Sequence, residues 1–452
     1  MKKSRRDFLR NATLAGGAIY TGAMSLSAQS YRRVLGSNDR VNVGVVGFSN
    51  RHQNDHIPAF LKSNKEMNFD IIAVSDIWSK RRETGQAFLK EKFGHDIQAC
   101  QNNDVLYSIK EVDAVIISTA DFQHALHTIE AVKAGRDSYT EKPLAETMED
   151  NRGVLKAVKE SGKIVQIGSQ RRSGKNYMAA CDFIRSGKFG PIVMVDLTWN
   201  VNQPGRWRRP GQVRQLKEQD TDWKRYLMNR PFESFDARKY LEFRLFWPYS
   251  SGIPGQWMSH QIDTVHWFSG YPHPRSVSAN GGVYVWKDGR RNADTYTAVF
   301  DYGPLDDSSS GFQVVYTSRQ TNSAGDVKEI YYSNAGSLNL DTNKITPEGG
   351  LTAHYAAEMN MGANLLPELS LNDMAIKVST EASTGGDPLT EAHMRNWMEC
   401  VRSRKQPNAP IEAGYNHSIA VIMANAAYRT GTKVTFNEKT QEVMAGDKAF
   451  TY

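Results

Sequence analysis

The sequence predicts an α/β protein of two domains: an N-terminal Rossmann domain on a doubly wound parallel sheet, then an α+β domain with a largely antiparallel sheet. Three observations carry this prediction. Across 41–168, short apolar strands alternate with helices in units of roughly 30 residues. Beyond residue 169, the strands alternate apolar and polar residues, with few helices between them. The chain of 452 residues is also too long for one ordinary core.

The Rossmann half (41–168) is predicted from short apolar runs separated by amphipathic segments. Val41 to Gly47 is a buried-strand pattern that ends in glycine. Gly135 and Gly162 follow two of the predicted helices and end them. The expected strands are 41–47, 70–75, 113–118, 137–140 and 163–167. One helix is expected after the first strand and ends near residue 64, and the others are expected at 79–93, 122–134 and 148–161.

The second half (169–452) is predicted to be an antiparallel sheet with helices on one face. An irregular stretch at about 200–251 interrupts it and is rich in Trp, Tyr, Arg and Pro. The expected strands are 192–199, 276–285, 295–300, 311–318, 329–333 and 337–340, and the expected helices are 177–186, 256–268, 390–402 and 416–429.

Residues 1–28 have the features of an export signal. Arg5 and Arg6 are followed by Phe8 and Leu9, then by a mildly apolar stretch and small residues near Ala28. The pattern resembles the twin-arginine signal, and an exposed amphipathic helix is the alternative. It predicts export in the folded state by the twin-arginine machinery to the periplasm or another extracytoplasmic space. We expect no membrane anchor after processing and a polar linker at 29–40.

Charge and cysteine content exclude several other classes. The net charge is +7, but residues 1–28 supply +4 of it, which leaves too weak a footprint for nucleic-acid binding. No apolar run approaches the roughly 18 residues that a membrane-spanning helix needs. The three cysteines form no C-x-x-C pair, so we expect reduced core thiols rather than a disulfide framework or a zinc ribbon.

A dinucleotide site is predicted at the turn after the first strand, where helix amides can bind a pyrophosphate. The turn reads Gly47-Phe48-Ser49-Asn50-Arg51-His52. Ser and His stand where the fingerprint has its second and third glycines, so a purely structural turn is the alternative. Asp76 ends the second strand, where an acid accepts hydrogen bonds from a ribose and disfavours a 2′-phosphate. We therefore expect NAD rather than NADP, a preference that the adjacent Lys80, Arg81 and Arg82 weaken.

Six motifs stand in order along the chain. They are Ser118 to Ala125, Thr140-Glu141-Lys142-Pro143-Leu144-Ala145, Gln166 to Ser173, Ser259 to Trp267, Arg395-Asn396-Trp397 and Tyr428 to Gly431. Together they resemble the glucose–fructose oxidoreductase/inositol dehydrogenase/rhizopine-catabolism (Gfo/Idh/MocA) family. The resemblance implies the same two-domain fold, binding of NAD or NADP, redox chemistry on sugars and polyols, and a homo-oligomer.

The same resemblance assigns roles to individual residues. Lys142 corresponds to the lysine that contacts the reacting hydroxyl and the nicotinamide ribose of the cofactor, where a cation stabilises a developing alkoxide and relays a proton. His260 corresponds to the second catalytic position, with a core histidine as the alternative. Gln256 stands where relatives have an Asp, four residues earlier on the same predicted helix face. The other cofactor-site residues implied are Ser118, Thr119, His124, Glu141, Gln170 and Arg171.

The stretch 200–251 points to a carbohydrate, with packing at the domain junction as the alternative. Aromatic faces stack on sugars, and arginines bind hydroxyls or carboxylates, so an acidic sugar also fits. The arginines concerned are Arg206, Arg208, Arg209 and Arg214. Low net charge argues against single-stranded nucleic acid. No metal is predicted, because His260, Asp263 and His266 fan around a helix instead of converging.

These expectations combine into an NAD(P)-dependent oxidoreductase acting on a sugar, polyol or glycoside hydroxyl. Outside the cytoplasm little free NAD is present, so we expect the cofactor to be retained and returned to its starting state. Two alternatives stay open. One is a redox-assisted glycosidase that uses bound NAD with no net redox change, and the other is a noncatalytic carbohydrate-binding protein.

Overall fold

The computed structural model describes residues 39–372 and 387–451. From residue 41 onward, the described residues form one compact unit. The predicted signal peptide lies outside the described residues, as does the predicted linker up to residue 38. Within the described ranges, no helix combines the length and the apolar character needed to cross a bilayer.

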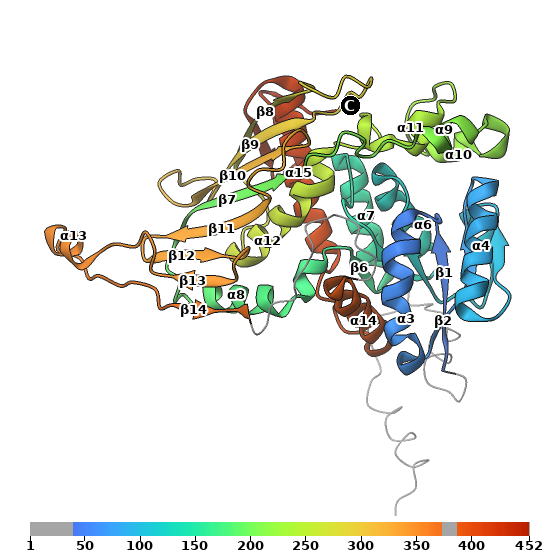
Figure 1. Ribbon diagram of the computed structural model, residues 1–452, viewed down its shortest axis with the longest axis horizontal. Coiled ribbons are helices and arrows are strands. Elements are labelled where there is room, and N and C mark those ends of the chain that lie inside the picture. Colours follow the sequence, from blue (N-terminus) through green and yellow to red (C-terminus); the bar gives the residue numbers. More distant parts are fainter. Residues whose placement is uncertain (1–38, 373–386, 452) are drawn as a thin grey trace, which may run out of the picture. The chain divides into compact units, whose positions relative to one another are not determined.

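Six parallel strands form the N-terminal sheet in the order β3-β2-β1-β4-β5-β6 (Figure 1). This doubly wound order confirms the predicted Rossmann fold. The strands are β1 Val41–Val46, β2 Phe69–Ser75, β3 Gln98–Cys100, β4 Ala114–Ile117, β5 Asp137–Thr140 and β6 Val165–Ile167, and the helices are α3 Ile57–Met67, α4 Ser79–Phe93, α5 Asn103–Ser108, α6 His124–Lys133 and α7 Met148–Ser161. The sequence pattern misses β3 and α5, because elements this short show no period.

An eleven-stranded sheet forms the C-terminal domain, in the order β14-β13-β12-β11-β7-β10-β9-β8-β15-β16-β17. Strand β7 runs parallel to β10, and the other neighbours are antiparallel. The largely antiparallel sheet is thus confirmed. Its strands are β7 Ile192–Asn200, β8 Ser276–Gly282, β9 Thr295–Tyr302, β10 Phe312–Arg319, β11 Val327–Ser333, β12 Gly336–Asn339, β13 Lys344–Thr346, β14 Leu369–Ser370, β15 Val434–Asn437, β16 Glu442–Ala445 and β17 Lys448–Ala449. The sequence analysis finds none of the short outer strands β13–β17.

Helices pack on one face of this sheet, as the alternating strands predict. In β9 the buried positions alternate with more exposed ones, and Val299 remains 36% exposed on the uncovered face. The longest helix, α15 (Ile411–Thr430), is buried around most of its circumference, because it packs against β8, α12 (Ser259–Ser269) and α7. It therefore lacks a polar face, which is typical of a helix enclosed on several sides. Three more helices lie outside stretch 200–251: α8 Lys175–Arg185, α13 Ala353–Glu358 and α14 Pro388–Ser403.

Helix α14 returns the end of the chain to the Rossmann domain. It packs against α3, and its Trp397 is fully buried in the same apolar cluster as Phe60 and Phe69. Its His393 bonds the carbonyl of Ile167 at 2.8 Å, at the end of β6. The core of the parallel sheet thus includes residues from beyond the predicted boundary at 168/169.

The irregular stretch contains three one- or two-turn helices, α9 Pro210–Gln215, α10 Trp223–Leu227 and α11 Ala237–Leu241. They lie beside α4 and α6 at one end of the parallel sheet (Figure 1). Side chains join the two parts: Gln123 donates to the carbonyl of Tyr226 at 2.7 Å, and Arg225 pairs with Glu130 at 2.7 Å. The stretch therefore covers the edge where the parallel strands end.

Candidate active site

A cavity of about 960 Å³ lies between the parallel-sheet edge and the C-terminal domain. Its walls include the turn after β1, the ends of β2 and β4, the Glu141–Lys142 segment after β5, residues of stretch 200–251, and the start of α12. In a doubly wound sheet, ligands bind at the carboxyl ends of the strands where the strand order reverses. Here that point lies between β1 and β4.

The turn after β1 follows the dinucleotide pattern only at its first glycine. Gly47 has φ +73°, and a Cβ there would lie 2.6 Å from Cγ2 of Thr119. Ser49, in place of the second glycine, contacts the Ser118 hydroxyl at 3.0 Å. His52, in place of the third, is buried under the helix and contacts the Ile116 carbonyl at 3.3 Å. The chain continues as a π-turn, His52–His56, before α3. The wider turn accommodates a histidine where a tight turn needs glycine.

Asp76 holds this turn in place. Its carboxylate accepts from the backbone N–H of Phe48 and of Trp78, both at 2.8 Å. Burial raises the pKa of Asp76, although both backbone hydrogen bonds favour its charged form. Of the three basic residues that follow, Arg81 lines the cavity and donates to Asn50 at 3.0 Å.

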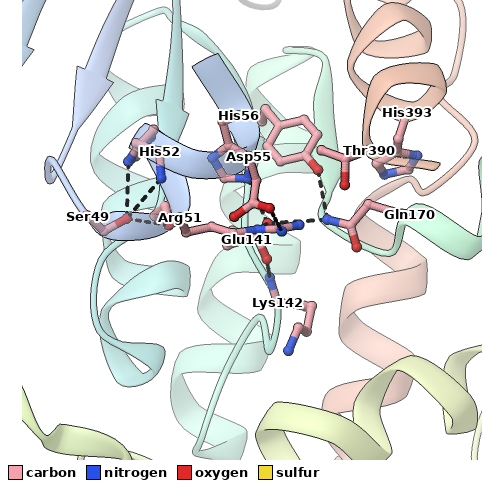
Figure 2. Close-up of polar contacts among 12 residues, drawn as sticks. Ser49, Arg51, His52, Asp55, His56, Glu141, Lys142, Gln170, Thr390 and His393 are labelled. Carbon is pink, nitrogen blue, oxygen red and sulfur yellow. Dashed lines mark hydrogen bonds and ion pairs between the residues drawn. The ribbon is translucent and has the colours of Figure 1, made fainter. Parts of the chain in front are cut away.

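Glu141 is the centre of a buried polar cluster (Figure 2). Its Oε1 accepts from Arg51 at 3.0 Å, from His56 at 2.8 Å and from Gln170 at 3.3 Å. Burial alone would raise the pKa of Glu141, but the charge of Arg51 and the hydrogen bond from His56 hold it well below its usual value. Glu141 and Gln170 therefore hold one another and Arg51 in position, and all three residues line the cavity. Figure 2 shows the Lys142 side chain pointing away from this cluster.

Lys142, Gln256 and His260 come together on the cavity wall, as predicted. Lys142 Nζ donates to the backbone carbonyl of Gln256 at 2.6 Å. Burial lowers the pKa of Lys142 to about 8, against the opposing charges of Glu141 and Asp121. Gln256 lies in a π-turn, Pro254–Met258, directly before α12. The start of the helix predicted at 256–268 is therefore a wider turn, and the regular α-helix begins at Ser259.

His260 is a neutral group on the wall. Burial and the charges of Lys142 and Arg171 hold its pKa well below the ordinary value. Its ring stacks on Trp199 with 5.9 Å between centroids, and it makes no hydrogen bond within the described residues. His124 is also neutral, because burial lowers its pKa. Its Nδ1 donates to the Pro143 carbonyl at 2.8 Å, which leaves Nε2 as an acceptor without a partner in the described part of the chain.

Comparison with known proteins identifies the N-terminal domain. Residues 41–169 match the profile of GFO_IDH_MocA, described as an oxidoreductase family with an NAD-binding Rossmann fold. Residues 41–169 are thus similar to the NAD-binding Rossmann domain of this oxidoreductase family. The inositol 2-dehydrogenase of Salmonella typhimurium is 29% identical over 198 residues, which cover 43% of this chain and 55% of that enzyme. The chain thus aligns with about half the length of the curated relatives it matches.

Solved structures extend the likeness to the C-terminal domain. The WlbA dehydrogenase from Bordetella pertussis, in complex with NADH and UDP-GlcNAcA, has a TM-score of 0.61 at 16% identity, over 88% of this chain and 98% of that one. Levoglucosan dehydrogenase, in complex with NADH and levoglucosan, has a TM-score of 0.62 at 14% identity, over 88% and 99%. At these identities the likeness establishes the fold.

Residues 41–169 contain one further site residue, Asp121, that was not predicted from the sequence. Asp121 is buried, and its Oδ2 accepts from Gln256 Nε2 and from the Ser250 hydroxyl, both at 2.6 Å. Arg244 Nε donates to Gln256 Oε1 at 2.6 Å. Both ends of the Gln256 amide therefore contact protein groups, and the residue also lines the cavity. Asp121 lies within the motif Ser118 to Ala125. An acidic residue shortly after a buried strand is the sequence feature that could have identified it.

The arginines of stretch 200–251 separate into two groups. Arg206 and Arg209 line the cavity, as does Arg244, which the sequence analysis does not select. Arg208 instead pairs with Glu242 and Asp288, and Arg214 is exposed and outside the cavity wall. Of the four arginines considered for a sugar, only Arg206 and Arg209 thus line the cavity.

Asp263 and His266, which were considered as metal ligands together with His260, each contact a different protein group. Asp263 accepts two hydrogen bonds from Arg172, at 2.8 and 3.0 Å, and His266 contacts the Tyr302 hydroxyl at 2.8 Å. Among the described residues, no group of three His, Cys, Asp or Glu side chains is arranged to bind a metal ion. Arg171, a predicted cofactor residue, lines the cavity and also pairs with Glu329.

The cavity fits a dinucleotide. A Cβ at Gly47 would close the cradle at the turn, and the Thr119 hydroxyl and His124 Nε2 are buried there without a partner among the described residues. The turn 47–51 would hold the pyrophosphate on backbone amides, and Asp76 would face the ribose. His124 and Lys142 would lie at the nicotinamide end.

Proposed function

We propose that the protein is an NAD-dependent oxidoreductase acting on a hydroxyl of a sugar, polyol or glycoside, exported through the twin-arginine pathway with its cofactor retained. The observation that carries the proposal is the pair Lys142 and His260 on one wall of the cavity beside the dinucleotide cradle. Relatives named for redox reactions of inositol and of 1,5-anhydro-D-fructose support the substrate class. Asp76 at the ribose position supports NAD over NADP.

Lys142 and His260 have different roles in the proposed reaction. When bound, NAD supplies the two-electron oxidation of the substrate carbon. Lys142 Nζ, with a pKa of about 8, removes the hydroxyl proton in its neutral form. Asp121 and Glu141 stabilise the ammonium that results. The neutral His260 ring is free of protein hydrogen bonds among the described residues and can orient the same hydroxyl.

Retention of the cofactor is supported by the contacts that join stretch 200–251 to the Rossmann domain. Lys80 donates to Gln215 at 2.5 Å, and Arg81 donates to Gln212 at 3.4 Å. The Tyr240 ring packs edge-on against Trp78 at 6.4 Å, directly after Asp76. We expect these contacts, which lie beside the cofactor end of the cavity, to slow the release of a bound dinucleotide.

The same contacts favour a second candidate, a redox-assisted glycosidase. A retained cofactor suits chemistry that returns it to its starting state. In such an enzyme a glycosidic C–O bond is broken and water is added, with no net redox change. Assays of the purified protein should therefore measure both sugar oxidation and glycoside hydrolysis.

The test is to purify the full-length exported protein, unfold it, and identify released nucleotide by mass spectrometry. Near-stoichiometric NAD is expected. The absence of nucleotide, together with no binding of added NAD or NADP, would contradict both enzymes and favour the noncatalytic carbohydrate-binding protein. The cellular fraction that contains the protein tests the export proposal separately.

The pH dependence follows from Lys142. Because its neutral form accepts the proton, the oxidation rate should rise with pH through about 8. Asp121→Asn keeps the shape but removes a negative charge that raises this pKa, so the rising limb should move to lower pH by about one unit. Rate–pH profiles of both proteins check this. An unmoved limb in the variant would separate Asp121 from the titration.

A further inference from the structure

We propose that the substrate sugar carries an anionic group, a carboxylate or a phosphate, and that Arg244 binds it with help from Arg206 and Arg209. This inference rests on the proposed function, because it names the substrate class of the same cavity. It goes further than the proposed function, because it requires the substrate to carry a negative charge.

Arg244 lies next to the reacting groups. Its Nε donates to the side chain of Gln256, the residue whose backbone carbonyl accepts from Lys142. Its guanidinium lies over the Phe243 ring at 4.5 Å. The two terminal Nη groups make no hydrogen bond within residues 39–372 and 387–451, although the residue lines the cavity. A guanidinium has five N–H donors in a planar fork, so a pair of donors remains for a bidentate acceptor.

The two other arginines concentrate positive charge at this wall. Arg206 lies over the Trp257 ring at 5.6 Å, and the side chain of Arg209 donates to the Arg208 carbonyl at 2.8 Å. Burial and the charge of Arg244 lower the pKa of both Arg206 and Arg209. Like charges held together in a partly desolvated wall are unfavourable until an anion binds between them.

The acidic side chains of the wall already have partners. Asp76 accepts from two backbone amides, and Glu141 is held by Arg51 and His56. Asp387 accepts from the Thr390 backbone and hydroxyl at the start of α14. Asp121, behind the wall, accepts from Gln256 and Ser250. The charges of Asp121 and Glu141 still act on Arg244, but neither carboxylate occupies its Nη donors, which are left for a ligand.

The position of Arg244 favours the substrate over the cofactor as the source of that anion. The dinucleotide phosphates are expected at the turn 47–51, beside Asp76 and Arg81, whereas Arg244 borders Gln256 and Lys142. Trp199 and Trp257 also line the cavity and stack on each other, with centroids 6.0 Å apart. A sugar bound beside Lys142 and Gln256 would place a charged substituent within reach of Arg244.

Calorimetric titration of the purified, nucleotide-containing protein tests the inference with paired probes. The pairs are methyl glucuronide with methyl glucoside and methyl galacturonide with methyl galactoside, and glucose 6-phosphate is the phosphate probe. At least one anionic probe should bind about ten-fold tighter than its neutral partner, since a charge-assisted hydrogen bond typically supplies that factor. The tighter of the uronide and the phosphate identifies the anion.

Variants show which arginine binds the anionic group. Arg244→Gln should abolish the preference, Arg244→Lys should keep part of it, and Arg209→Gln should weaken it while leaving the contact to Gln256 intact. Arg214→Gln, an exposed arginine of the same stretch, is the matched control and should bind as the natural protein does. Thermal unfolding and nucleotide content of each variant check that the fold and the cofactor site persist.

The remaining outcomes overturn the inference. Equal binding of neutral and anionic probes, binding of none of them, or a preference that survives both Arg244→Gln and Arg209→Gln would contradict it. Nucleotide content distinguishes the two levels of failure: with NAD retained, the oxidoreductase proposal stands and only the substrate class is wrong. Without NAD, the proposed function fails as well.

Discussion

Lys142→Met should lower the oxidation rate by a factor of about 10²–10⁴, the usual contribution of a positioned acid–base group. Methionine keeps an apolar stem of similar length but removes the amine that donates to the Gln256 carbonyl. Single-turnover reduction of the bound NAD by the sugar selected in the titrations measures the rate. The nucleotide content should not change, because the predicted pyrophosphate contacts lie at the turn 47–51.

Lys175→Met is the control for this experiment. Lys175 is exposed at the start of α8 and does not line the cavity. It should keep the full rate. If Lys142→Met also kept it, Lys142 would have no part in the mechanism. If Lys142→Met lost its nucleotide, the lysine would serve cofactor binding instead of proton transfer.

Asp150→Ala should lower the free energy of unfolding by about 3–5 kcal/mol, because it leaves the buried Arg230 charge without its partner. The two side chains form an ion pair at 3.1 Å, and each is 1% exposed. Asn229 also donates to Asp150 at 2.7 Å, and the Arg230 guanidinium lies over Phe122 at 5.0 Å. Denaturant unfolding monitored by fluorescence and circular dichroism measures the loss.

Glu149→Ala is the matched control, since Glu149 is the exposed neighbour in the first turn of α7. Its cost should stay within about 1 kcal/mol, the size of a helix-terminus charge effect. Because Arg230 belongs to stretch 200–251, Asp150→Ala should also lower the nucleotide content. Equal stability of the two variants would contradict a structural role for the buried pair.

The elements with a clear period were predictable from the sequence. Strand β1 and helix α7 match their predicted ranges within a residue, because each shows a clear apolar pattern and is followed by a glycine. The turn at Gly47 was harder, because Ser49 and His52 depart from the glycine pattern. The π-turn at His52–His56 makes room for them, and no local sequence rule predicts such a turn.

The sequence by itself determined the two-domain α/β class with a doubly wound parallel sheet and, through the family resemblance, Lys142 and His260 as candidate reacting groups. These follow from local periodicity and from short motifs. The tertiary structure alone decided that Asp121 and Arg244 occupy both ends of Gln256, and that Arg206 and Arg209 face the cavity while Arg208 and Arg214 do not. Those contacts join residues more than a hundred positions apart or lie in a stretch without regular structure. Their directions depend on long-range packing and on the pairing of buried charges, which no local pattern records.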